Sequence, residues 1–414
     1  MRILILTYGS HGDVLPFVAL GAALRTAGHQ PILAAPARFA ALAATAQIDF
    51  IPLPGNIDEL ARQIADEARG QPLRLISILY RFALPIGIAI AQRIQQAAQA
   101  ADMIVYSFLM NGLGHLYAQQ RGIAECAVDL FPFFDPPAEL ANLMWTHTRM
   151  AFHWRRLSHL FAQTVFRFCQ NIAYRILRYR CPKIGPPHLP WAAPGRDIPL
   201  LLAYSATLVP PGLGPLSVQT GSWYLQPNGW HPPSELKAFL ASGPPPVVVN
   251  FGSMASREAP RIIALAVAAT ERAGLRGIVQ RGWAKLPIER LPAPFYLADE
   301  IPHDWLLPQA AAIIHHGGAG TTATALRFGL PAVIIPFAAD QPFWAWRAHL
   351  TGANPAPIPV NELSVERLST ALLEALNPVY RARAAQISAR MQAEGGVAAA
   401  VAQIEQWIDT LSPT

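Results

Sequence analysis

Residues 311–329 read AAIIHHGGAGTTATALRFG, and this stretch decides the fold. The run AAIIH is typical of a buried strand, the glycines that follow are typical of a turn, and TTATALRF is typical of a helix. A glycine turn that leads into a helix presents unpaired backbone N–H groups and the positive end of the helix dipole, which together bind anions. The stretch therefore predicts a strand–turn–helix unit with an anion site.

Side chains in the same stretch indicate a negatively charged ligand, and a nucleotide diphosphate is the candidate. His316 can donate a hydrogen bond to a phosphate oxygen, while Thr321 and Thr322 can add hydroxyl groups or cap the helix. No lysine follows the glycines, so the stretch is not a Walker A loop, and it is not GxGxxG either. A glycine turn with two histidines at the edge of the core is the alternative, purely structural interpretation.

The alternation of strand-like and helix-like stretches continues outward from this unit over both halves of the chain. Apolar strand candidates lie at 2–7, 30–35, 49–53, 102–107 and 124–130 in the first half, and at 246–250, 275–280, 311–315 and 330–337 in the second. Helix candidates include 14–28, 112–122, 259–274 and the end of the chain from Ser364. Such alternation predicts an α/β fold in which helices cover parallel sheets on both faces.

The length of 414 residues suits two domains of about 200 residues each. Leu208–Pro233 is rich in proline and glycine, which is typical of a connection between domains. We therefore expect a first domain over 1–215, a linker over 216–235, a second domain over 236–396 and a separate C-terminal segment over 397–414.

Composition limits the class of protein and its surroundings. Apolar residues make up 52% and charged residues 14%, as in a globular protein. Cys126, Cys169 and Cys181 form no CxxC pair, which argues against a disulfide framework or structural zinc and favours the reducing cytoplasm. The N-terminal apolar run passes directly into a glycine turn, unlike a signal peptide. The most apolar window, Leu75–Ala91, is interrupted by Arg81, so we expect no membrane span.

Positive charge is concentrated in one segment, because residues 140–196 contain nine Lys or Arg and no Asp or Glu. Within it an apolar helical face is predicted by Met150, Trp154, Leu157, Phe161, Val165, Phe168, Ile172 and Ile176. One long basic amphipathic helix, or two in sequence, could touch an anionic membrane surface through segment 149–183. It could also line an apolar acceptor pocket, or pack on its own domain with solvated arginines. Without a recognised motif, nucleic-acid binding is not expected.

Further polar groups follow other predicted strands. Asp340 and Gln341 come after the strand that ends near Phe337, where parallel sheets bind ligands, and could grip adjacent sugar hydroxyls. Asp340 could instead serve as a helix N-cap. Two glycine–serine turns, TYGSHGDVLP at 7–16 and NFGSMAS at 250–256, follow the first strand of each half. These two turns could close on one diphosphate from both sides.

Several of these segments resemble one known family. They are GSHGDVLPFVALGAAL (9–24), VQTGSWYL (218–225), VNFGSM (249–254), QRGW (280–283), the block at 301–337 and DQPFWAWRAHLTGANPAPIP (340–359). The chain resembles a family-1 glycosyltransferase of the GT-B fold, on the sterol 3-beta-glucosyltransferase-like branch. The resemblance implies two Rossmann-like domains that face a central cleft, with C-terminal helices that cross back to the first domain.

The resemblance also implies the activity and the site. It implies inverting, metal-independent transfer of a hexose, glucose above all, from a UDP-sugar such as UDP-glucose to a hydroxyl of a sterol, lipid, polyketide or polyphenol. The acceptor would bind the first half and the donor the second. Donor contacts are implied for Gly9, Ser10, Gly252, Ser253, Trp283, Ile301, His303, His315, His316, Gly317, Gly318, Ala319, Gly320, Thr321, Thr322, Asp340 and Gln341.

The catalytic base has two candidates. Asp13 occupies the position of the base, where many relatives have His, although an ordinary Asp has a pKa near 3.9 and is a weak base unless desolvated. Relatives on this branch commonly read Ser-Arg-Gly-Asp, whereas this chain has His11 in place of Arg, and His11 is the second candidate. Asp13 could also merely cap a helix that starts at Val14.

Two alternatives to a transferase are a catalytically silent partner protein and an acceptor-free epimerase or hydrolase. The chain contains no Asp-x-Asp, the usual carboxylate pair for a metal-bound nucleotide sugar, so backbone N–H groups and the helix dipole would meet the leaving-group charge. A catalytically silent partner protein should lose the base and the donor pair, yet Asp13, His316, Asp340 and Gln341 are all present. An acceptor-free epimerase or hydrolase would have no use for the aromatic middle segment.

Overall fold

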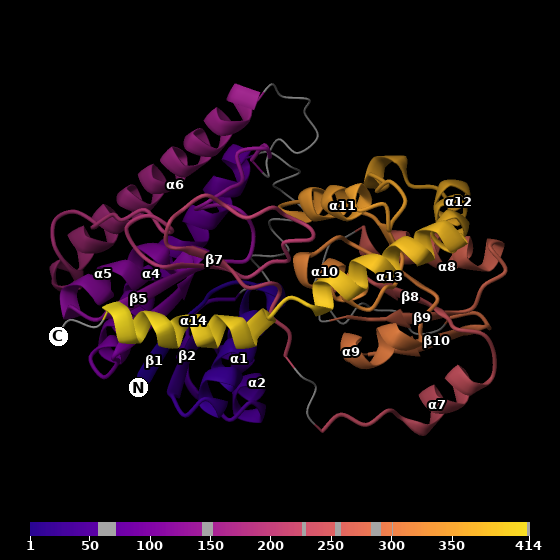
Figure 1. Ribbon diagram of the computed structural model, residues 1–414, viewed down its shortest axis with the longest axis horizontal. Helices are drawn as coiled ribbons and strands as arrows, with labels where there is room; N and C mark the ends of the chain where they lie inside the picture. Colours follow the sequence, from indigo (N-terminus) through magenta and orange to yellow (C-terminus); the bar gives the residue numbers. More distant parts are fainter. Residues whose placement is uncertain are drawn as a thin grey trace. The chain divides into compact units, whose positions relative to one another are not determined.

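Two parallel β-sheets form the chain, each in a separate unit (Figure 1). The computed structural model describes residues 1–56, 72–142, 152–225, 229–252, 258–282, 291–299 and 301–411. The first unit takes in Met1–Leu60, Ile76–Leu225 and Glu394–Thr414, and the second is built mainly on Gln226–Ala393.

The first sheet has seven parallel strands in the order β3-β2-β1-β4-β5-β6-β7. They are β1 (Arg2–Leu6), β2 (Gln30–Pro36), β3 (Asp49–Leu53), β4 (Met103–Ser107), β5 (Ala124–Asp129), β6 (Leu200–Leu202) and β7 (Ser217–Gln219). The central strands are buried on both faces, which explains their continuous apolar runs. All five strands predicted in this half are present. The sequence analysis missed β6 and β7, which have only three residues each.

Helices flank this sheet, and the last of them comes from the far end of the chain. The helices are α1 (His11–Thr26), η1 (Ala37–Phe39), α2 (Ala40–Thr45), α4 (Pro72–Ala98), η3 (Phe108–Met110), α5 (Asn111–Arg121), α6 (Phe152–Arg180), η5 (Pro182–Ile184) and α14 (Gly396–Leu411). Figure 1 shows α14, in yellow, beside α1, and the two helices pack together. Ala400, Val401, Ile404 and Trp407 enter the core of the first unit, so the prediction that the C-terminal helix returns to the first domain is confirmed.

The second sheet has five parallel strands in the order β10-β9-β8-β11-β12. They are β8 (Val247–Asn250), β9 (Gly277–Gln280), β10 (Phe295–Ala298), β11 (Ala312–His315) and β12 (Ala332–Ile334). Its helices are α7 (Ser234–Ala241), α8 (Ala259–Arg272), α9 (His303–Leu306), η6 (Leu307–Gln309), α10 (Ala319–Arg327), α11 (Gln341–Leu350), η7 (Val360–Glu362), α12 (Val365–Ala375) and α13 (Pro378–Gln392). Strand β10 was not predicted. The α/β class and the parallel sheets are confirmed.

The predicted linker begins too early. Its segment 216–235 includes β7, which pairs with β6, and the first unit extends to Leu225. A three-residue edge strand is too short to show a period-2 pattern among prolines and glycines. The first helix also differs from the prediction, because α1 begins at His11 rather than at Val14, with Ser10 as its N-cap.

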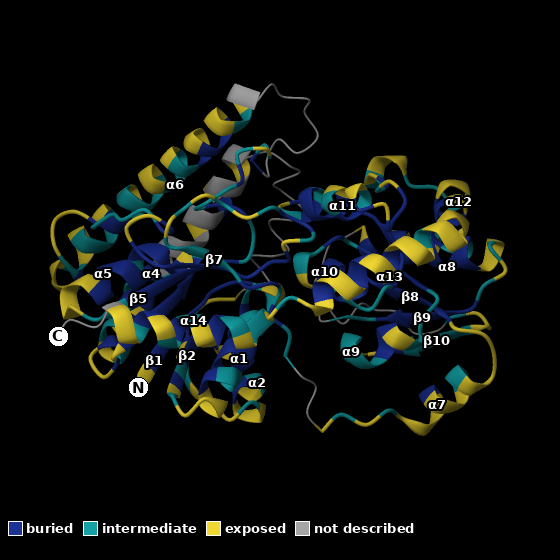
Figure 2. Ribbon diagram, in the orientation of Figure 1, coloured by how far each residue is buried: buried dark blue, intermediate teal, exposed yellow. Residues whose placement is uncertain are grey.

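Helix α6 is one long helix, but its predicted apolar face points to solvent instead of to the core of the unit. The large apolar side chains of the predicted face are exposed: Trp154 by 55%, Leu157 by 47%, Phe161 by 60%, Phe168 by 64% and Ile172 by 36%. In Figure 2 the ribbon of α6 is coloured mainly exposed and intermediate. Helix α6 does pack on its own unit, through Phe166 among others, but most of its predicted apolar face is exposed rather than buried. Arg149 and Met150 lie outside the described residues.

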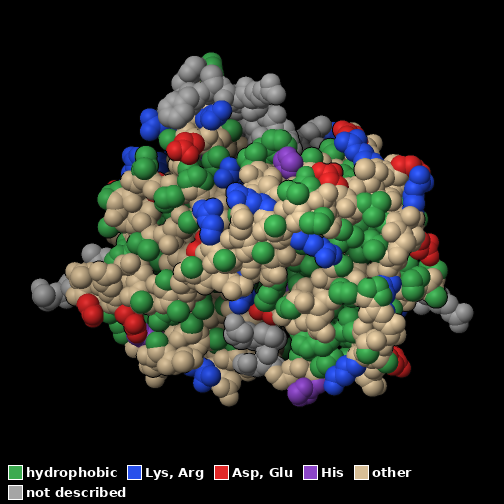
Figure 3. Space-filling view, turned by 45° about the vertical axis from the view of Figure 1, so that its right-hand side comes forward, with side chains coloured by type: hydrophobic (Ala, Val, Ile, Leu, Met, Phe, Trp, Pro, Cys, Tyr) green, Lys and Arg blue, Asp and Glu red, His purple; other side chains and the backbone are tan. Residues whose placement is uncertain are grey.

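None of the helices in the described part of the chain is both long enough and apolar enough to cross a bilayer. Cys126 is buried, Cys169 and Cys181 are half-buried, and none of the three forms a disulfide. Figure 3 shows charged side chains that are sparse and separated by hydrophobic and other uncharged atoms, as the low content of charged residues predicts.

Candidate functional site

The predicted strand–turn–helix unit is present in the second unit. Strand β11 ends at His315, Gly317 adopts a φ of +84°, and α10 begins at Ala319 with Gly318 as its N-cap. The N-cap makes no side-chain hydrogen bond to the first turn. The N–H groups of this turn and the positive end of the α10 dipole are therefore available to an anion.

The imidazole of His316 lies between two glycine turns. A Cβ atom on Gly318 would lie 2.5 Å from its Nε2, and a Cβ on Gly252, after β8, would lie 2.9 Å from its Cε1. Burial, and secondarily the nearby His303, lowers the pKa of His316 to about 4. The ring is therefore neutral near pH 7 and can donate one hydrogen bond, so the positive potential of the turn comes from α10 rather than from this histidine.

Two neighbouring residues from the predicted set support the turn from inside. His315 is fully buried, and its Nδ1 accepts a hydrogen bond from the N–H of Gly317 at 3.0 Å. Burial, with the nearby His316 and His303, lowers the pKa of His315 well below its usual value. Thr322 is also buried, and its N–H donates to the carbonyl of Gly318 at 2.9 Å. Thr321, in the first turn of α10, is half-buried.

Asn250 and Gln280 join three loops of this site, and the sequence analysis did not identify either residue. Asn250 lies at the end of β8, where its Oδ1 accepts from the N–H of Gly252 at 2.6 Å. Its Nδ2 donates to Gln280 Oε1 at 3.0 Å and to His303 Nε2 at 2.9 Å. Burial lowers the pKa of His303 to about 4, which keeps Nε2 an acceptor. A buried polar residue at a strand's carboxyl end, read together with the next glycine, is the signal that could have indicated Asn250.

Asp340 and Gln341 lie after β12, at the same edge of the sheet. Gln341 Oε1 accepts from the N–H groups of Phe337 and Ala338 at 2.9 and 3.3 Å. Asp340 is the N-cap residue of α11, yet its carboxylate makes no cap hydrogen bond and instead accepts from Trp344 Nε1 at 2.8 Å. Ala339 before it adopts a left-handed φ of +57°, an unusual conformation for a residue with a side chain. Backbone N–H groups thus orient Gln341, and the indole of Trp344 orients Asp340.

The remaining predicted donor contacts are only partly described. Ser253 and Trp283 lie outside the described residues. Ile301 is buried, and its N–H approaches Gln280 Oε1 at 3.5 Å. A cavity of about 270 Å³ borders Ile301 and is lined further by Trp230, Arg281, Tyr296 and Asp299. Among the described residues, no three His, Cys, Asp or Glu side chains gather as a group that could hold a metal ion.

Asp13 lies in the first unit, in the first turn of α1. Its Oδ2 accepts from the N–H of Ser10 at 2.7 Å and from Ser10 Oγ at 2.8 Å, so Asp13 is the N3 residue of a capping box. A Cβ on Gly9 would lie 2.4 Å from the same oxygen. Within the described residues, Oδ1 accepts no hydrogen bond. Burial raises the pKa of Asp13, while the two Ser10 hydrogen bonds lower it in part.

His11, the second candidate base, is the first residue of α1 and is half-buried. Its ring centroid lies 5.6 Å from that of Phe39. The carboxylate of Asp13 turns back to Ser10, and the structure gives no hydrogen bond between Asp13 and His11. Asp13 therefore combines desolvation with a defined carboxylate geometry, whereas His11 packs on an aromatic ring.

A cluster of phenylalanines lies at the same edge of the first sheet, beyond β4 and β5. Its rings lie 4.4–6.4 Å apart and belong to Phe108, Phe131, Phe133, Phe134 and Phe166. The phenylalanines at 108 and 131–134 were not identified from the sequence. The run FPFF at 131–134 is the signal that was missed.

Asp129, at the end of β5, holds the backbone of this cluster in place. Its Oδ2 accepts from the N–H groups of Phe133 and Phe134 at 3.2 and 2.8 Å. Oδ1 is buried and has no partner among the described residues. Complete burial raises the pKa of Asp129 to about 8 despite these two hydrogen bonds.

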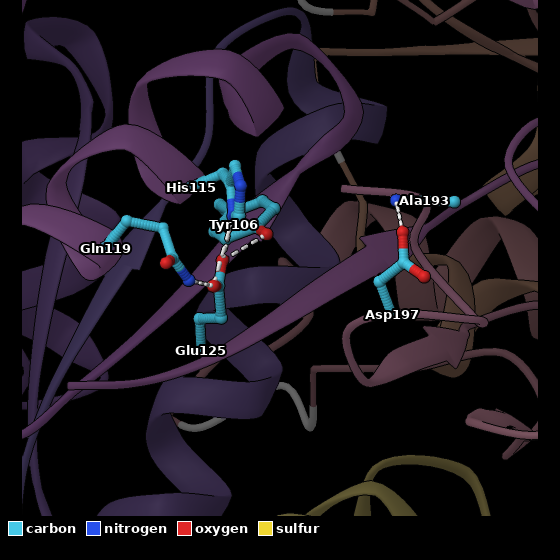
Figure 4. Close-up of polar contacts among 6 residues, drawn as sticks. All are labelled: Tyr106, His115, Gln119, Glu125, Ala193 and Asp197. Carbon is cyan, nitrogen blue, oxygen red and sulfur yellow. Dashed lines mark hydrogen bonds and ion pairs between the residues drawn. The ribbon is translucent and has the colours of Figure 1, made fainter. Parts of the chain in front are cut away.

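Glu125 forms a second buried polar cluster in the first unit (Figure 4). Its carboxylate accepts from Tyr106 Oη at 2.7 Å, lies 2.9 Å from His115 Nδ1 and accepts from Gln119 Nε2 at 2.9 Å. Glu125 lies near the beginning of β5, whereas ligand sites of parallel sheets lie at the carboxyl ends. We therefore assign this cluster to the stability of the unit rather than to the site.

Comparison with known proteins identifies both halves of the chain. A family model described as Glycosyltransferase family 28 N-terminal domain matches residues 3–106, and one described as Erythromycin biosynthesis protein CIII-like, C-terminal domain, matches residues 281–406. The chain is 31% identical over 435 residues to O-mycaminosyltylonolide 6-deoxyallosyltransferase of Streptomyces fradiae, with 99% of this chain and 98% of that protein covered.

A second similar protein is a sterol 3-beta-glucosyltransferase of Arabidopsis thaliana, which is 32% identical over 428 residues. The alignment covers 97% of this chain and 64% of the plant protein, so the chain spans just under two thirds of that relative.

Solved structures show the same fold. A calicheamicin glycosyltransferase superposes with a TM-score of 0.73 at 18% identity, over 100% of this chain and 99% of that one. A spinosyn rhamnosyltransferase complexed with thymidine diphosphate superposes with a TM-score of 0.66 at 20% identity, over 98% and 100%. The predicted GT-B fold is confirmed. The chain belongs to the GT-B glycosyltransferases, on the branch that includes sterol 3-beta-glucosyltransferases and macrolide glycosyltransferases.

Proposed function

We propose that this chain transfers glucose from UDP-glucose to a hydroxyl group of a hydrophobic acceptor, with inversion at the anomeric carbon. The observation that carries the proposal is the arrangement of His316 between two glycine turns at the N-terminus of α10. Asp340 and Gln341 follow the neighbouring strand at the same edge of the sheet. One sheet edge thus offers donors for a diphosphate and polar groups for the attached sugar.

In the proposed reaction, Asp13 accepts the proton of the acceptor hydroxyl on Oδ1. The acceptor oxygen then attacks the anomeric carbon from the side opposite the diphosphate, and the bond between that carbon and the diphosphate oxygen breaks. UDP leaves with the bonding electron pair, and the first-turn N–H groups of α10 together with His316 stabilise its charge. Because these donors belong to the protein, we expect unchanged activity after treatment with a chelator.

For the acceptor we propose the phenylalanine cluster of the first unit as the binding surface. Phe108, Phe131 and Phe134 are half-buried at the sheet edge that also carries Asp13. Apolar rings with few charges fit a polycyclic or macrolide skeleton better than a polar sugar chain. The plant and Streptomyces relatives carry names with acceptors of these two kinds, a sterol and O-mycaminosyltylonolide.

A second candidate donor is a thymidine-diphosphate sugar. The Streptomyces relative that matches over almost the full length of both proteins is a 6-deoxyallosyltransferase, and two structural neighbours were solved with thymidine diphosphate.

Calorimetric titration without added metal tests the donor site first. We expect UDP and UDP-glucose to bind, and His316→Ala to weaken binding about tenfold or more through loss of a hydrogen bond to a charged group. The exposed His188, in the first unit, offers the control His188→Ala, which should bind like the wild type. Tighter binding of TDP-glucose would favour the second donor.

Incubation with sterols and macrolide aglycones then tests transfer, with product mass and anomeric configuration as readouts. Retention of the donor's configuration would contradict the inverting mechanism. If no nucleotide binds, the silent partner protein becomes the better interpretation. If the nucleotide sugar is consumed without an acceptor, an epimerase or hydrolase becomes the better interpretation.

A further inference from the structure

We propose that the outer face of α6 binds an anionic lipid surface. The outer face is defined here by its exposed apolar side chains, Trp154, Leu157, Leu160, Phe161, Phe168 and Ile172. This interaction is separate from sugar transfer and does not depend on the identity of the donor.

The inner face of α6 packs on its own unit through apolar side chains such as Phe166 and through several polar side chains. His159 Nε2 lies 2.9 Å from the carbonyl of Leu140, Gln163 Nε2 donates to the carbonyl of Phe133 at 2.7 Å, and Tyr174 Oη donates to that of Pro186 at 2.8 Å. These bonds fix the rotation of the helix about its axis. The apolar side chains consequently point to solvent, where exposing so much contiguous apolar area has a cost unless another surface covers it.

The arginines beside the outer face favour a negatively charged surface as its binding partner. Arg156 and Arg167, eleven residues apart, are exposed along one border of the face, and Arg175 is exposed near its C-terminal end. No Asp or Glu occurs between residues 140 and 196. Long arginine side chains can reach lipid phosphates while neighbouring leucine and phenylalanine side chains enter the acyl boundary, as in helices that lie in the membrane interface.

A second copy of the chain fits this face less well. Twofold pairing would bring the same patch of each copy together, and with it two arginine rows that have no carboxylate in the segment to neutralise them. Anionic lipid headgroups supply that negative charge. An uncharged apolar partner would offer no negative charge to the exposed Arg167 and Arg175, so charge complementarity favours the membrane.

Vesicle co-sedimentation of the full chain tests this proposal, with phosphatidylcholine vesicles made with and without phosphatidylserine. Wild type should bind preferentially when phosphatidylserine is present. Leu160→Ser with Phe168→Ser should lose binding to both kinds of vesicle, because these side chains are 60% and 64% exposed and supply buried apolar area at the membrane. The matched control is Leu350→Ser with Val379→Ser, which removes two exposed apolar side chains of the second unit.

The charge requirement needs its own variants. Arg167→Gln with Arg175→Gln should weaken binding only to vesicles with phosphatidylserine, by about fivefold per arginine. Arg381→Gln with Arg390→Gln removes two exposed arginines of α13 and should have no effect. All positions are exposed, so the variants should keep the wild-type circular dichroism and nucleotide affinity, which separates this proposal from the proposed transferase.

Three results would overturn the proposal. The first is wild-type protein that binds neither kind of vesicle. The second is an equal loss of binding in Leu160→Ser with Phe168→Ser and in the control, Leu350→Ser with Val379→Ser. The third is a concentration-dependent dimer, seen by analytical ultracentrifugation, that Leu160→Ser with Phe168→Ser dissociates while vesicle binding is unaffected. That result would assign the outer face of α6 to a second copy.

Discussion

At the scale of single residues, glycines set how closely functional side chains approach the backbone of the site. Gly318 leaves room for the imidazole of His316, and Gly9 leaves room for the carboxylate of Asp13. Gly9 has a φ of +144°, a conformation that other residues rarely adopt. The position of each side chain therefore depends on a residue that contributes no functional group of its own.

Gly9→Ala should displace the carboxylate of Asp13, because the added Cβ would lie 2.4 Å from Oδ2. We expect kcat to fall by at least about tenfold if Asp13 is the base, since general bases contribute more than that. Gly12→Ala is the control, because its added Cβ would meet nothing nearer than Ser10 Oγ at 3.8 Å. Equal kcat in both variants would contradict a dependence of catalysis on this geometry.

The pH dependence of transfer distinguishes Asp13 from His11. A base must be deprotonated, and burial raises the pKa of Asp13, so kcat/KM should fall as pH decreases through a value above that of an ordinary Asp. Asp13→Asn should lower kcat/KM by a factor of about 10²–10⁴ and remove this limb. If the limb instead disappears in His11→Gln and persists in Asp13→Asn, His11 is the base.

At the scale of elements, the loops after β4 and β5 carry the phenylalanines of the proposed acceptor surface, and a single buried carboxyl group orders one of these loops. Asp129 accepts two backbone hydrogen bonds from the loop at 133–134 and is fully buried. Its pKa of about 8 means that the folded chain favours the protonated form at mildly acidic pH. The loop is thus ordered by the Asp129 carboxyl group, whose ionised form is destabilised by burial.

Stability should therefore fall as pH rises. The pKa of Asp129 is about 8 in the folded chain and about 3.9 in an unfolded one, so its stabilising contribution is complete below pH 4 and is lost as pH rises to 8. Asp129→Asn keeps an oxygen acceptor without the charge. Its melting temperature, relative to wild type, should rise between pH 5 and pH 8. The exposed Asp49 provides the control Asp49→Asn, and an unchanged difference at both pH values would contradict the assignment.

How far the sequence predicts each element depends on its length and its surroundings. Strands that lie within longer apolar runs, such as β1 and β12, were predicted, whereas β6, β7 and β10 have only three or four residues and no readable period. The turn between β11 and α10 was predicted because glycines between an apolar run and a helical pattern indicate a turn. Asn250 was missed, because its role arises only when β8, β9 and the loop before α9 come together. The rotation of α6 was missed because loop carbonyls, absent from any periodicity, hold its polar side.

At the scale of the whole molecule, the first unit is completed by a segment distant in sequence. Helix α14 supplies Ile404 and Trp407 to a core that otherwise comes from residues 1–225. The return is anchored at Glu394, whose Oε1 accepts from Ser205 Oγ at 2.7 Å and from Thr207 Oγ1 at 3.2 Å. The stability of the first unit therefore depends on residues that follow the second.

Ile404→Ala should destabilise the first unit by about 2–5 kcal/mol, as expected for a fully buried isoleucine. In differential scanning calorimetry the transition of the first unit should move to lower temperature. The transition that UDP raises, which belongs to the second unit, should stay in place. Gln406→Ala, at an exposed position of the same helix, is the control. A shift of the UDP-sensitive transition alone would contradict this division of the chain.

The return of α14 has a consequence for how the protein is made. On the ribosome, residues 1–225 emerge first but still lack Ala400, Val401, Ile404 and Trp407 while the whole second unit is synthesised. The second unit can close its core as soon as its own strands and helices have emerged. The core of the first unit can therefore close only after the second unit has been synthesised, and its apolar surface stays uncovered until α14 emerges.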